Sequence, residues 1–387
     1  MKFVFWVSAA LLFYTFAGYP LLMVVYARLR KRQVKQAKIE PRVSIVIAAH
    51  NEAAVIAAKL ANLAQLDYPA ECVEIIVASD GSDDGTDDIV RRSNDVRVRL
   101  ISCPRLGKAS ALNQAVAAAR GEIVCFTDAR QMVEHAALRS LVRNFADPEV
   151  GCVSGELMLV NSSSEPSGLG LYWKIEKLVR QAESDTGSVI GATGALYAVR
   201  RELVPKLPAG IILDDVFIPL QVARLGKRIL FESDAQVWDA LSTDVIHEFR
   251  RKTRTLAGNY QLVQKSPSLL LPSNPLWFPF VSHKLSRLAA PAMLVAALLS
   301  SWALAEERPY FLLAVVQTIC YSGSLVVLKF PAVSRRFKIA NVVFSFCMLN
   351  AAAAYAFFQF FRSRNDLSRL WMQQQRPTTS RAAAQGQ

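Results

Sequence analysis

The sequence predicts an α/β domain with a mostly parallel β-sheet, flanked by N- and C-terminal transmembrane helices. Strand-like and helix-like segments alternate over residues 43–126, which is typical of a parallel sheet covered by helices on both faces. Polar residues follow the ends of three of these strands, where such sheets bind their ligands. Long apolar runs lie near both ends of the chain.

Composition narrows the class of protein before any motif is considered. The 387 residues are 52% hydrophobic, and 45 Lys and Arg against 32 Asp and Glu give a net charge of +13. This excludes a small disulfide scaffold and a disordered chain. The positive charge suits nucleic acid, an anionic membrane surface or phosphorylated substrates. The apolar runs favour the membrane, and we expect no nucleic acid partner. The six cysteines show no CxxC or metal-ligand spacing, so we expect reduced thiols in a cytosolic domain.

The first expected element is a membrane anchor over residues 1–27. Its apolar run, residues 3–26, is long enough to cross a hydrocarbon core of about 30 Å. A cleaved signal peptide is the alternative, but the charge order is reversed, because only Lys2 precedes the run. A basic linker, residues 28–41, follows the anchor and favours a cytoplasmic location for the next domain. Its basic residues include Arg28, Arg30, Lys31, Arg32, Lys35 and Lys38.

The expected sheet begins directly after the linker. Residues 43–49 are an unbroken apolar run, typical of a strand covered on both faces, and residues 52–65 continue with helical spacing of apolar side chains. Further strands are expected at residues 73–78, 96–101 and 123–126, with a helix over residues 109–119. This order predicts a doubly wound sheet.

Three strand ends carry polar motifs. They are Ala49-His50-Asn51-Glu52, the acidic turn of residues 79–86, and Thr127-Asp128-Ala129-Arg130. Taken alone, the acidic turn could simply cap the next helix. In this order, the three motifs together resemble the family 2 glycosyltransferases, over roughly residues 42–260. The membrane segments are similar to those of cellulose, hyaluronan and poly-N-acetylglucosamine synthases. The resemblance implies a GT-A-like, nucleotide-sugar-binding domain over residues 42–265.

The resemblance also implies a donor site. It places a uridine or similar nucleotide against Ala49, Asn51 and Glu52, with Asp80 accepting a hydrogen bond from the base. Lys108 begins the helix after the third strand and is placed to meet the diphosphate, because its ammonium and the helix N-terminus both attract anions. A solvated surface lysine is the alternative interpretation.

Asp128 is the expected metal ligand. The family pattern Asp-x-Asp binds Mg²⁺ or Mn²⁺ together with the donor phosphates. Arg130 stands at the position of the second aspartate. Either Asp128 holds the metal with help from elsewhere, or Arg130 partly replaces the charge of the metal. For Asp128, a helix cap is the plain alternative.

The acceptor side is expected around two later motifs. The segment of residues 191–197 resembles the small-residue stretch beneath the acceptor, where Gly194 allows the backbone to approach a sugar. Asp214 and Asp215 resemble the acidic pair at a helix start. We assign Asp215 as the base that takes the proton of the attacking hydroxyl, and Asp214 as support for the acceptor site. An ordinary acidic helix N-terminus is the alternative.

Residues 248–260 fall where processive relatives carry Gln-x-x-Arg-Trp. Arg251 then corresponds to the glutamine, Arg254 to the arginine and Thr255 to the tryptophan. We expect Arg251 and Arg254 to lie at the donor site, where Arg254 neutralises the diphosphate leaving group. Thr255 lacks the aromatic face that would hold a growing polymer at the acceptor site, so few transfers per binding event are expected. A basic interfacial helix is compatible with the same residues.

The chain is expected to end in membrane helices. An interfacial segment over residues 266–287 precedes about three helices in residues 288–361, and a basic, disordered tail covers residues 362–387. Four crossings in total would put this basic tail outside, against its preference for the cytoplasm. One segment is therefore expected not to cross, either residues 288–305 or a re-entrant stretch near residues 277–280.

The resulting functional hypothesis is an inverting, membrane-bound hexosyl- or N-acetylhexosaminyltransferase of the bacterial-type inner membrane. It would use a nucleotide-diphosphate sugar, with UDP-sugar as the expected donor, and a polysaccharide or polyprenyl-linked acceptor for cell-surface polysaccharide. Export-complex proteins are further expected partners beside the lipid bilayer. The alternative is a non-catalytic subunit that senses nucleotide sugars or assembles an export complex, and Arg130 and Thr255 favour it.

Overall fold

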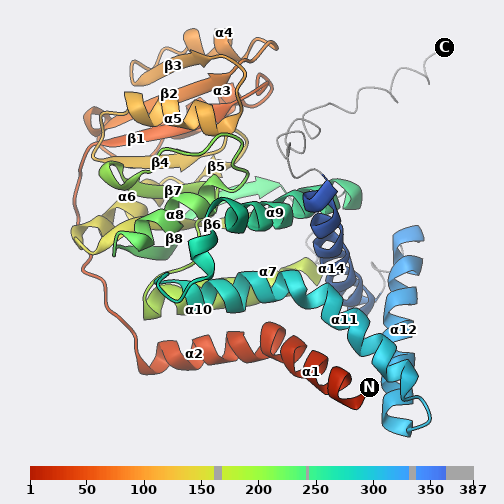
Figure 1. Ribbon diagram of the computed structural model, residues 1–387. Coiled ribbons are helices and arrows are strands. Elements are labelled where there is room, and N and C mark those ends of the chain that lie inside the picture. Colours follow the sequence, from red (N-terminus) through yellow and green to blue (C-terminus); the bar gives the residue numbers. More distant parts are fainter. Residues whose placement is uncertain (161–167, 241–243, 331–336, 363–387) are drawn as a thin grey trace, which may run out of the picture.

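A computed structural model describes residues 1–160, 168–240, 244–330 and 337–362. One eight-stranded sheet forms the centre of the upper part of the molecule, and long helices extend below it (Figure 1). The basic tail beyond residue 362 and the basic residues at 335 and 336 lie outside the described residues.

The sheet is mixed, with strand order β3-β2-β1-β4-β7-β6-β8-β5. The strands β1 to β4 pair in parallel, as the alternation of strands and helices predicted. The pairs β4 with β7, β6 with β7 and β5 with β8 are antiparallel, whereas β6 and β8 are parallel. The strands are β1 (Val43–Ala49), β2 (Val73–Asp80), β3 (Val98–Cys103), β4 (Ile123–Thr127), β5 (Met132–Val133), β6 (Val150–Val160), β7 (Leu196–Arg200) and β8 (Arg228–Ala240).

Helices cover both faces of the sheet. One core combines the sheet with α5 (Lys108–Ala118), α8 (Asp214–Arg224) and part of α9 (Val245–Lys265). The other core combines it with α3 (Ile56–Ala64), α4 (Thr86–Arg91) and α6 (Ala137–Val142). Alternate side chains of β1 point into the two cores, which explains why its sequence is apolar at almost every position.

Two elements begin later than the sequence pattern predicts. The helix expected from residue 52 begins at Ile56, because the backbone amides of Glu52 and Ala53 donate to side chains of the loop after β2. The strand expected from residue 96 begins at Val98, because Asp95 accepts the backbone amide of Arg97 in a turn. Polar side chains of neighbouring turns move both boundaries.

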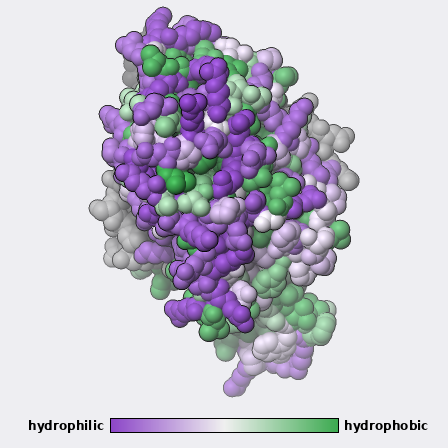
Figure 2. Space-filling model, turned by 90° about the vertical axis from the view of Figure 1, so that its left-hand side faces the viewer, coloured by the Kyte–Doolittle hydropathy of each residue, from purple (hydrophilic) through white to green (hydrophobic). Residues whose placement is uncertain are grey.

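Within the described residues, four helices are long and apolar enough to cross a membrane. The first is Lys2–Leu29, formed by α1 (Lys2–Phe13), a π-helical turn (Tyr14–Gly18) and α2 (Tyr19–Leu29). The second, Trp277–Ala303, joins α10 (Trp277–Pro279), a π-helical segment (Phe280–Leu285) and α11 (Ser286–Ala303). The others are α12 (Arg308–Lys329) and α14 (Lys338–Arg362). The second helix thus includes part of the segment expected to be interfacial. Figure 2 shows a largely hydrophilic sheet domain above a part richer in hydrophobic residues.

Helix α7 (Gly168–Thr186) connects the two parts of the molecule. Val179 and Ala182 of this helix pack with Tyr19 and Met23 of α2. The buried Glu183 accepts a hydrogen bond from the Tyr19 hydroxyl at 2.8 Å. The sheet domain is therefore fixed to the first of these apolar helices through apolar packing and a buried polar contact. All six cysteines are free thiols, as expected.

Candidate active site

The expected site residues gather at one edge of the sheet. The parallel strands β1, β2 and β4 end there, and the N-termini of α5 and α8 face the same edge through Lys108 and Asp214. Five segments far apart in the sequence, three strand ends and two helix N-termini, therefore supply charged groups to one place.

The ends of β1 and β2 are held together by side chain to backbone contacts. Asn51 exchanges two hydrogen bonds with Asp83, at 2.8 and 3.0 Å, and adopts a left-handed conformation with φ of 56°. Ala49 is the last residue of β1 and is buried. Burial and the nearby charge of Asp128 raise the pKa of Glu52. Ala49, Asn51 and Glu52 thus lie together at the end of β1, and the Glu52 carboxyl is close enough to Asp128 to feel its charge.

Asp80 is buried and shapes the loop before α5. Its Oδ1 accepts the backbone amides of Leu106 and Gly107, each at 2.9 Å. Gly107 has φ of 91°, a conformation that favours glycine. Asp80 therefore positions the loop that leads to Lys108, a role in addition to the expected hydrogen bond to the nucleotide base.

Lys108 bridges two carboxylates from different segments. Its Nζ lies 3.1 Å from Asp128 Oδ1 and 3.4 Å from Asp214 Oδ1. Burial would lower the pKa of Lys108, but Asp128, Asp214 and Asp215 hold it above the usual value. The lysine is therefore a cation at the centre of an acidic cluster, and the interpretation as a solvated surface lysine is wrong.

Arg130 pairs with a residue outside its own motif and not with the motif carboxylate Asp128. Its Nη2 lies 2.7 Å from the buried Asp239 of β8, which also accepts from Gln131 at 3.0 Å. Half of the Arg130 side chain remains exposed. Among the described residues, Asp128 forms its ion pair with Lys108 and none with Arg130.

Asp215 lies in a buried environment beneath the small-residue segment. Gly194 donates its backbone amide to Asp215 Oδ2 at 3.0 Å, and a Cβ added at Gly194 would lie 3.1 Å from the same oxygen. Burial and the neighbouring charge of Asp214 raise the pKa of Asp215 to about 6. A carboxyl with this pKa is mostly ionised at neutral pH and can still accept a proton, which suits a general base.

Helix α9 divides the basic motif between two environments. Arg254 is close enough to Asp128, Asp215 and Asp214 for their charges to oppose the lowering of its pKa by burial. Its Nε is buried and has no hydrogen-bond partner among the described residues. Arg251 instead pairs with Glu248 of the same helix at 2.9 Å, and Thr255 is exposed. The structure thus brings Arg254 to the acidic cluster, whereas Arg251 and Thr255 form their hydrogen bonds within α9, to Glu248 and to the Arg251 carbonyl.

One buried residue of this edge escaped the sequence motifs. Lys59 of α3 is fully buried and donates to Thr127 Oγ1 at 2.8 Å and to the Gln131 carbonyl at 2.6 Å. Burial lowers the pKa of Lys59 to about 8. A signal existed, because Lys59 occupies the apolar stripe of its helix with Ile56 and Leu63.

The protein side chains at this edge could hold a divalent metal only with further ligands from the substrate and water. Among the described residues there is no group of three His, Cys, Asp or Glu side chains that could enclose a metal ion. Asp128 keeps 40% of its side chain exposed at this edge. A cation here would take one protein carboxylate and its remaining oxygens from a bound diphosphate and water, which Mg²⁺ accepts.

Comparison with known proteins gives consistent likenesses. Residues 44–207 match the family described as "Glycosyl transferase family 2". The chain is 30% identical over 240 residues to "Probable glycosyltransferase YdaM" of Bacillus subtilis (strain 168), covering 58% of this chain and 57% of that protein. It is 24% identical over 269 residues to the poly-beta-1,6-N-acetyl-D-glucosamine synthase of Staphylococcus aureus (strain COL), covering 67% and 63%. The chain thus spans less than two thirds of these relatives.

A solved structure resembles nearly the whole chain. It is a mannosyltransferase from Pyrobaculum calidifontis in complex with GDP-Man and Mn²⁺. The TM-score is 0.71 at 25% sequence identity, and the match covers 94% of this chain and 100% of the other. The likeness includes the membrane-type helices as well as the sheet.

Proposed function

The chain carries a glycosyltransferase family 2 domain with the GT-A fold, and on this premise we propose that it is an inverting, membrane-bound glycosyltransferase. It transfers a hexosyl or N-acetylhexosaminyl group from a nucleotide-diphosphate sugar to a polysaccharide or lipid-linked acceptor. The observation that supports this most is the meeting of Lys108, Asp128, Asp215 and Arg254 at one sheet edge. These groups supply the charges that such a transfer requires.

In the proposed reaction the acceptor hydroxyl attacks the anomeric carbon of the donor sugar. The new bond forms as the bond from that carbon to the diphosphate breaks, and the hydroxyl proton passes to Asp215 Oδ. Gly194 holds this carboxylate in place. Lys108 and Arg254 attract the diphosphate, whose negative charge grows as it leaves. A bound Mg²⁺ or Mn²⁺ on Asp128 would neutralise further charge on the diphosphate.

The nucleotide of the donor is tested directly. The sequence predicts a UDP-sugar, whereas the solved neighbour was crystallised with GDP-Man. Purified full-length protein, reconstituted in lipid and supplied with Mn²⁺, is incubated with a panel of UDP- and GDP-sugars. We expect release of nucleoside diphosphate from one class of donor, and mass spectrometry then identifies the sugar product.

The non-catalytic alternative has its own support. Arg130 replaces the second aspartate of the metal motif and is held by Asp239, so the centre has fewer carboxylates than the family pattern. A nucleotide-sugar sensor or assembly subunit would bind a donor without consuming it. Donor binding with no nucleotide release across the whole panel, with or without metal, would establish that alternative.

A further inference from the structure

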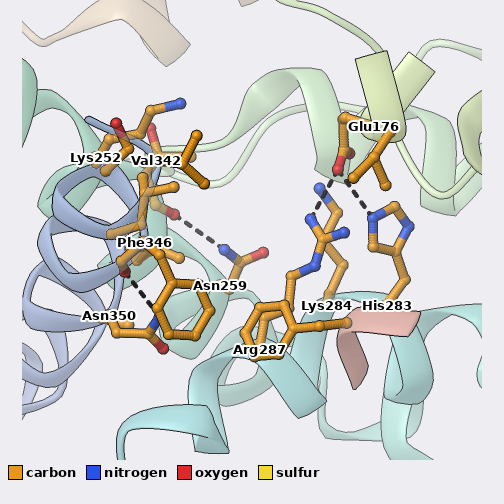
Figure 3. Close-up of a pocket in the computed structure, with 16 residues that line it drawn as sticks. Glu176, Lys252, Asn259, His283, Lys284, Arg287, Val342, Phe346 and Asn350 are labelled. Atoms are coloured by element: carbon orange, nitrogen blue, oxygen red, sulfur yellow. Dashed lines mark hydrogen bonds and ion pairs between the residues drawn. The ribbon is translucent and has the colours of Figure 1, made fainter. Parts of the chain in front are cut away.

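A second cavity lies between the catalytic domain and the long helices. It has a volume of about 340 Å³ and is bounded by α7, α9, α14 and the helix that begins at Trp277, with Phe16 closing one end. Its α14 wall is mostly apolar, and Glu176, His283, Lys284 and Arg287 lie together on the opposite side, whereas Lys252 lies near Val342 (Figure 3). The apolar wall contains Val342, Phe346, Leu349 and Ala353. Such a mixed lining suits a ligand with a hydrocarbon part and a polar head.

The polar wall carries more positive than negative charge. Lys252, Lys284 and Arg287 line the cavity with a single carboxylate, that of Glu176. Glu176 is already engaged, since Arg287 Nη1 lies 2.7 Å and His283 Nε2 3.2 Å from its Oε2 (Figure 3). Burial alone would raise the pKa of Glu176, but the charges of His283 and Arg287 hold it well below the usual range. The one anion of the wall is therefore fully ionised and compensated.

Two polar groups of the wall lack partners. Within the described part of the chain, the Lys284 ammonium makes no hydrogen bond or ion pair. The side chain of Asn259 is 95% buried, and its Oδ1 accepts no hydrogen bond there. A partly buried cation and a buried acceptor without partners are costly unless a ligand satisfies them. A phosphate satisfies the first, and a sugar hydroxyl satisfies the second.

The cavity also adjoins the expected catalytic base. The charge of Lys284 acts on Asp215 and opposes the rise of its pKa. Thr255 and Asn259 line the cavity from the same helix that carries Arg254 to the acidic cluster. A ligand whose head lies against Lys284 would therefore lie within electrostatic reach of Asp215.

We propose that this cavity holds the phosphate of a lipid-linked acceptor, with the phosphate against Lys252, Lys284 and Arg287 and the hydrocarbon along the apolar wall of α14. The assignment rests on the proposed transferase function and names its acceptor class. A neutral glycan would leave the Lys284 ammonium without an anion, and a free phosphate would leave the apolar wall unfilled. Of the two proposed acceptors, polysaccharide and lipid-linked, the lipid-linked acceptor thus matches the residues that line the cavity.

The test measures lipid binding by full-length protein in nanodiscs of neutral lipid. The probe is a photoreactive polyisoprenyl monophosphate, and its competitors are the corresponding alcohol, inorganic phosphate and phosphatidylglycerol. We expect labelling of peptides from α9 or α14, and competition at least tenfold weaker by each competitor than by unlabelled probe. Labelling elsewhere, or equal competition by the alcohol or by phosphatidylglycerol, overturns the proposal.

Variants connect the binding to the cavity. Lys284→Gln should weaken probe affinity at least tenfold, and Lys284→Arg should restore it, which excludes misfolding as the cause. Lys265→Gln is the matched control, because Lys265 lies on α9 outside the cavity and contacts the Ala209 carbonyl at 3.4 Å. Equal losses in Lys284→Gln and Lys265→Gln would show general attraction to anionic lipid and contradict the proposal.

A separate measurement distinguishes failure of the site from failure of the function. Wild-type protein in neutral lipid is supplied with nucleotide sugars, and nucleoside diphosphate released by transfer to water is measured. Donor turnover without lipid-phosphate binding refutes the acceptor site and leaves the transferase function standing. Lipid-phosphate binding with no turnover of any donor refutes the transferase function, and with it the role of this lipid as an acceptor.

Discussion

Asp215 is held in place by a backbone amide and made a stronger base by its surroundings. Because Gly194 donates to Oδ2, an asparagine can keep the same hydrogen bond without accepting a proton. Asp215→Asn should therefore lower the rate of transfer by about 10²- to 10⁴-fold. Donor affinity should stay within a few-fold, since the base does not hold the nucleotide. Steady-state kinetics and equilibrium donor binding check this, and near-normal turnover would remove Asp215 from the role of base.

The pH dependence of transfer follows from the same residue. Burial and Asp214 raise the pKa of Asp215 to about 6, and only the ionised carboxylate can take a proton. The rate should therefore fall as pH drops through about 6 and level off above it. Asp214→Asn removes a negative neighbour, lowers the pKa of Asp215, and should move this limb to lower pH. The control is Asp234→Asn, because Asp234 is an exposed carboxylate paired with Arg143. This substitution should leave the limb in place. A limb that does not move in Asp214→Asn would assign the titration to another group.

Lys59 supports the loop that carries Asp128 and Arg130. Replacing it with methionine keeps the apolar stem but leaves the Gln131 carbonyl without its 2.6 Å donor. We expect Lys59→Met to cost about 1–3 kcal/mol of stability and to weaken donor binding through the displaced loop. Thermal unfolding with and without nucleotide measures both effects, and Lys206→Met, at an exposed lysine, is the control. An unchanged unfolding temperature would show that Lys59 is not a structural support.

At the scale of elements, α9 contributes to the proposed acceptor site. Thr255 is exposed and lines the second cavity, where processive relatives are expected to carry a tryptophan. A threonine methyl offers a sugar ring far less surface than an indole. Wild-type protein should therefore release products after one or a few transfers. Product sizing under donor excess and limiting enzyme tests this, and long chains beside unreacted acceptor would contradict it.

Local pattern predicted the elements of the sheet better than their contacts. The apolar run of β1 gave its bounds correctly, since a strand buried on both faces needs no partner information. The start of α3 was wrong, because Asp84 and Thr86 hold the preceding residues in a turn. The Arg130 to Asp239 pair could not be predicted, because it joins residues far apart in the chain.

The whole molecule suggests an answer to the conflict over membrane crossings. Lys2 pairs with Glu307 at 2.8 Å, so the N-terminus and the loop between α11 and α12 lie on one side. Helix α14, although apolar enough to cross, packs on α9 of the catalytic domain through rings of Tyr260, Phe357 and Phe360. Residues 277–303 form one continuous long helix and not a re-entrant stretch. We therefore expect three crossings, with α14 at the interface.

This topology makes a prediction about the basic tail. Three crossings place the C-terminus on the same side of the membrane as the catalytic domain. The positive charges of the tail favour the cytoplasm as that side. A reporter that is fluorescent only in the cytoplasm, fused after residue 387, should be active. The same reporter inserted in the loop after α11 should be inactive. Inactive reporters at both positions would show that α14 crosses the membrane.

The contacts of the first helix have a consequence for biogenesis. Phe5 packs edge-on against Tyr310, and the Tyr14 hydroxyl donates to Ser282 at 2.7 Å, so residues made first meet residues made near the end of translation. The nascent α1 must wait in the bilayer while the ribosome completes the sheet domain. Its tertiary partners emerge only with the last third of the chain. Ribosome stalling before residue 277 should therefore leave a folded domain whose α7 already packs on α2 while α1 remains undocked, and assembly is completed as a late, post-insertion step.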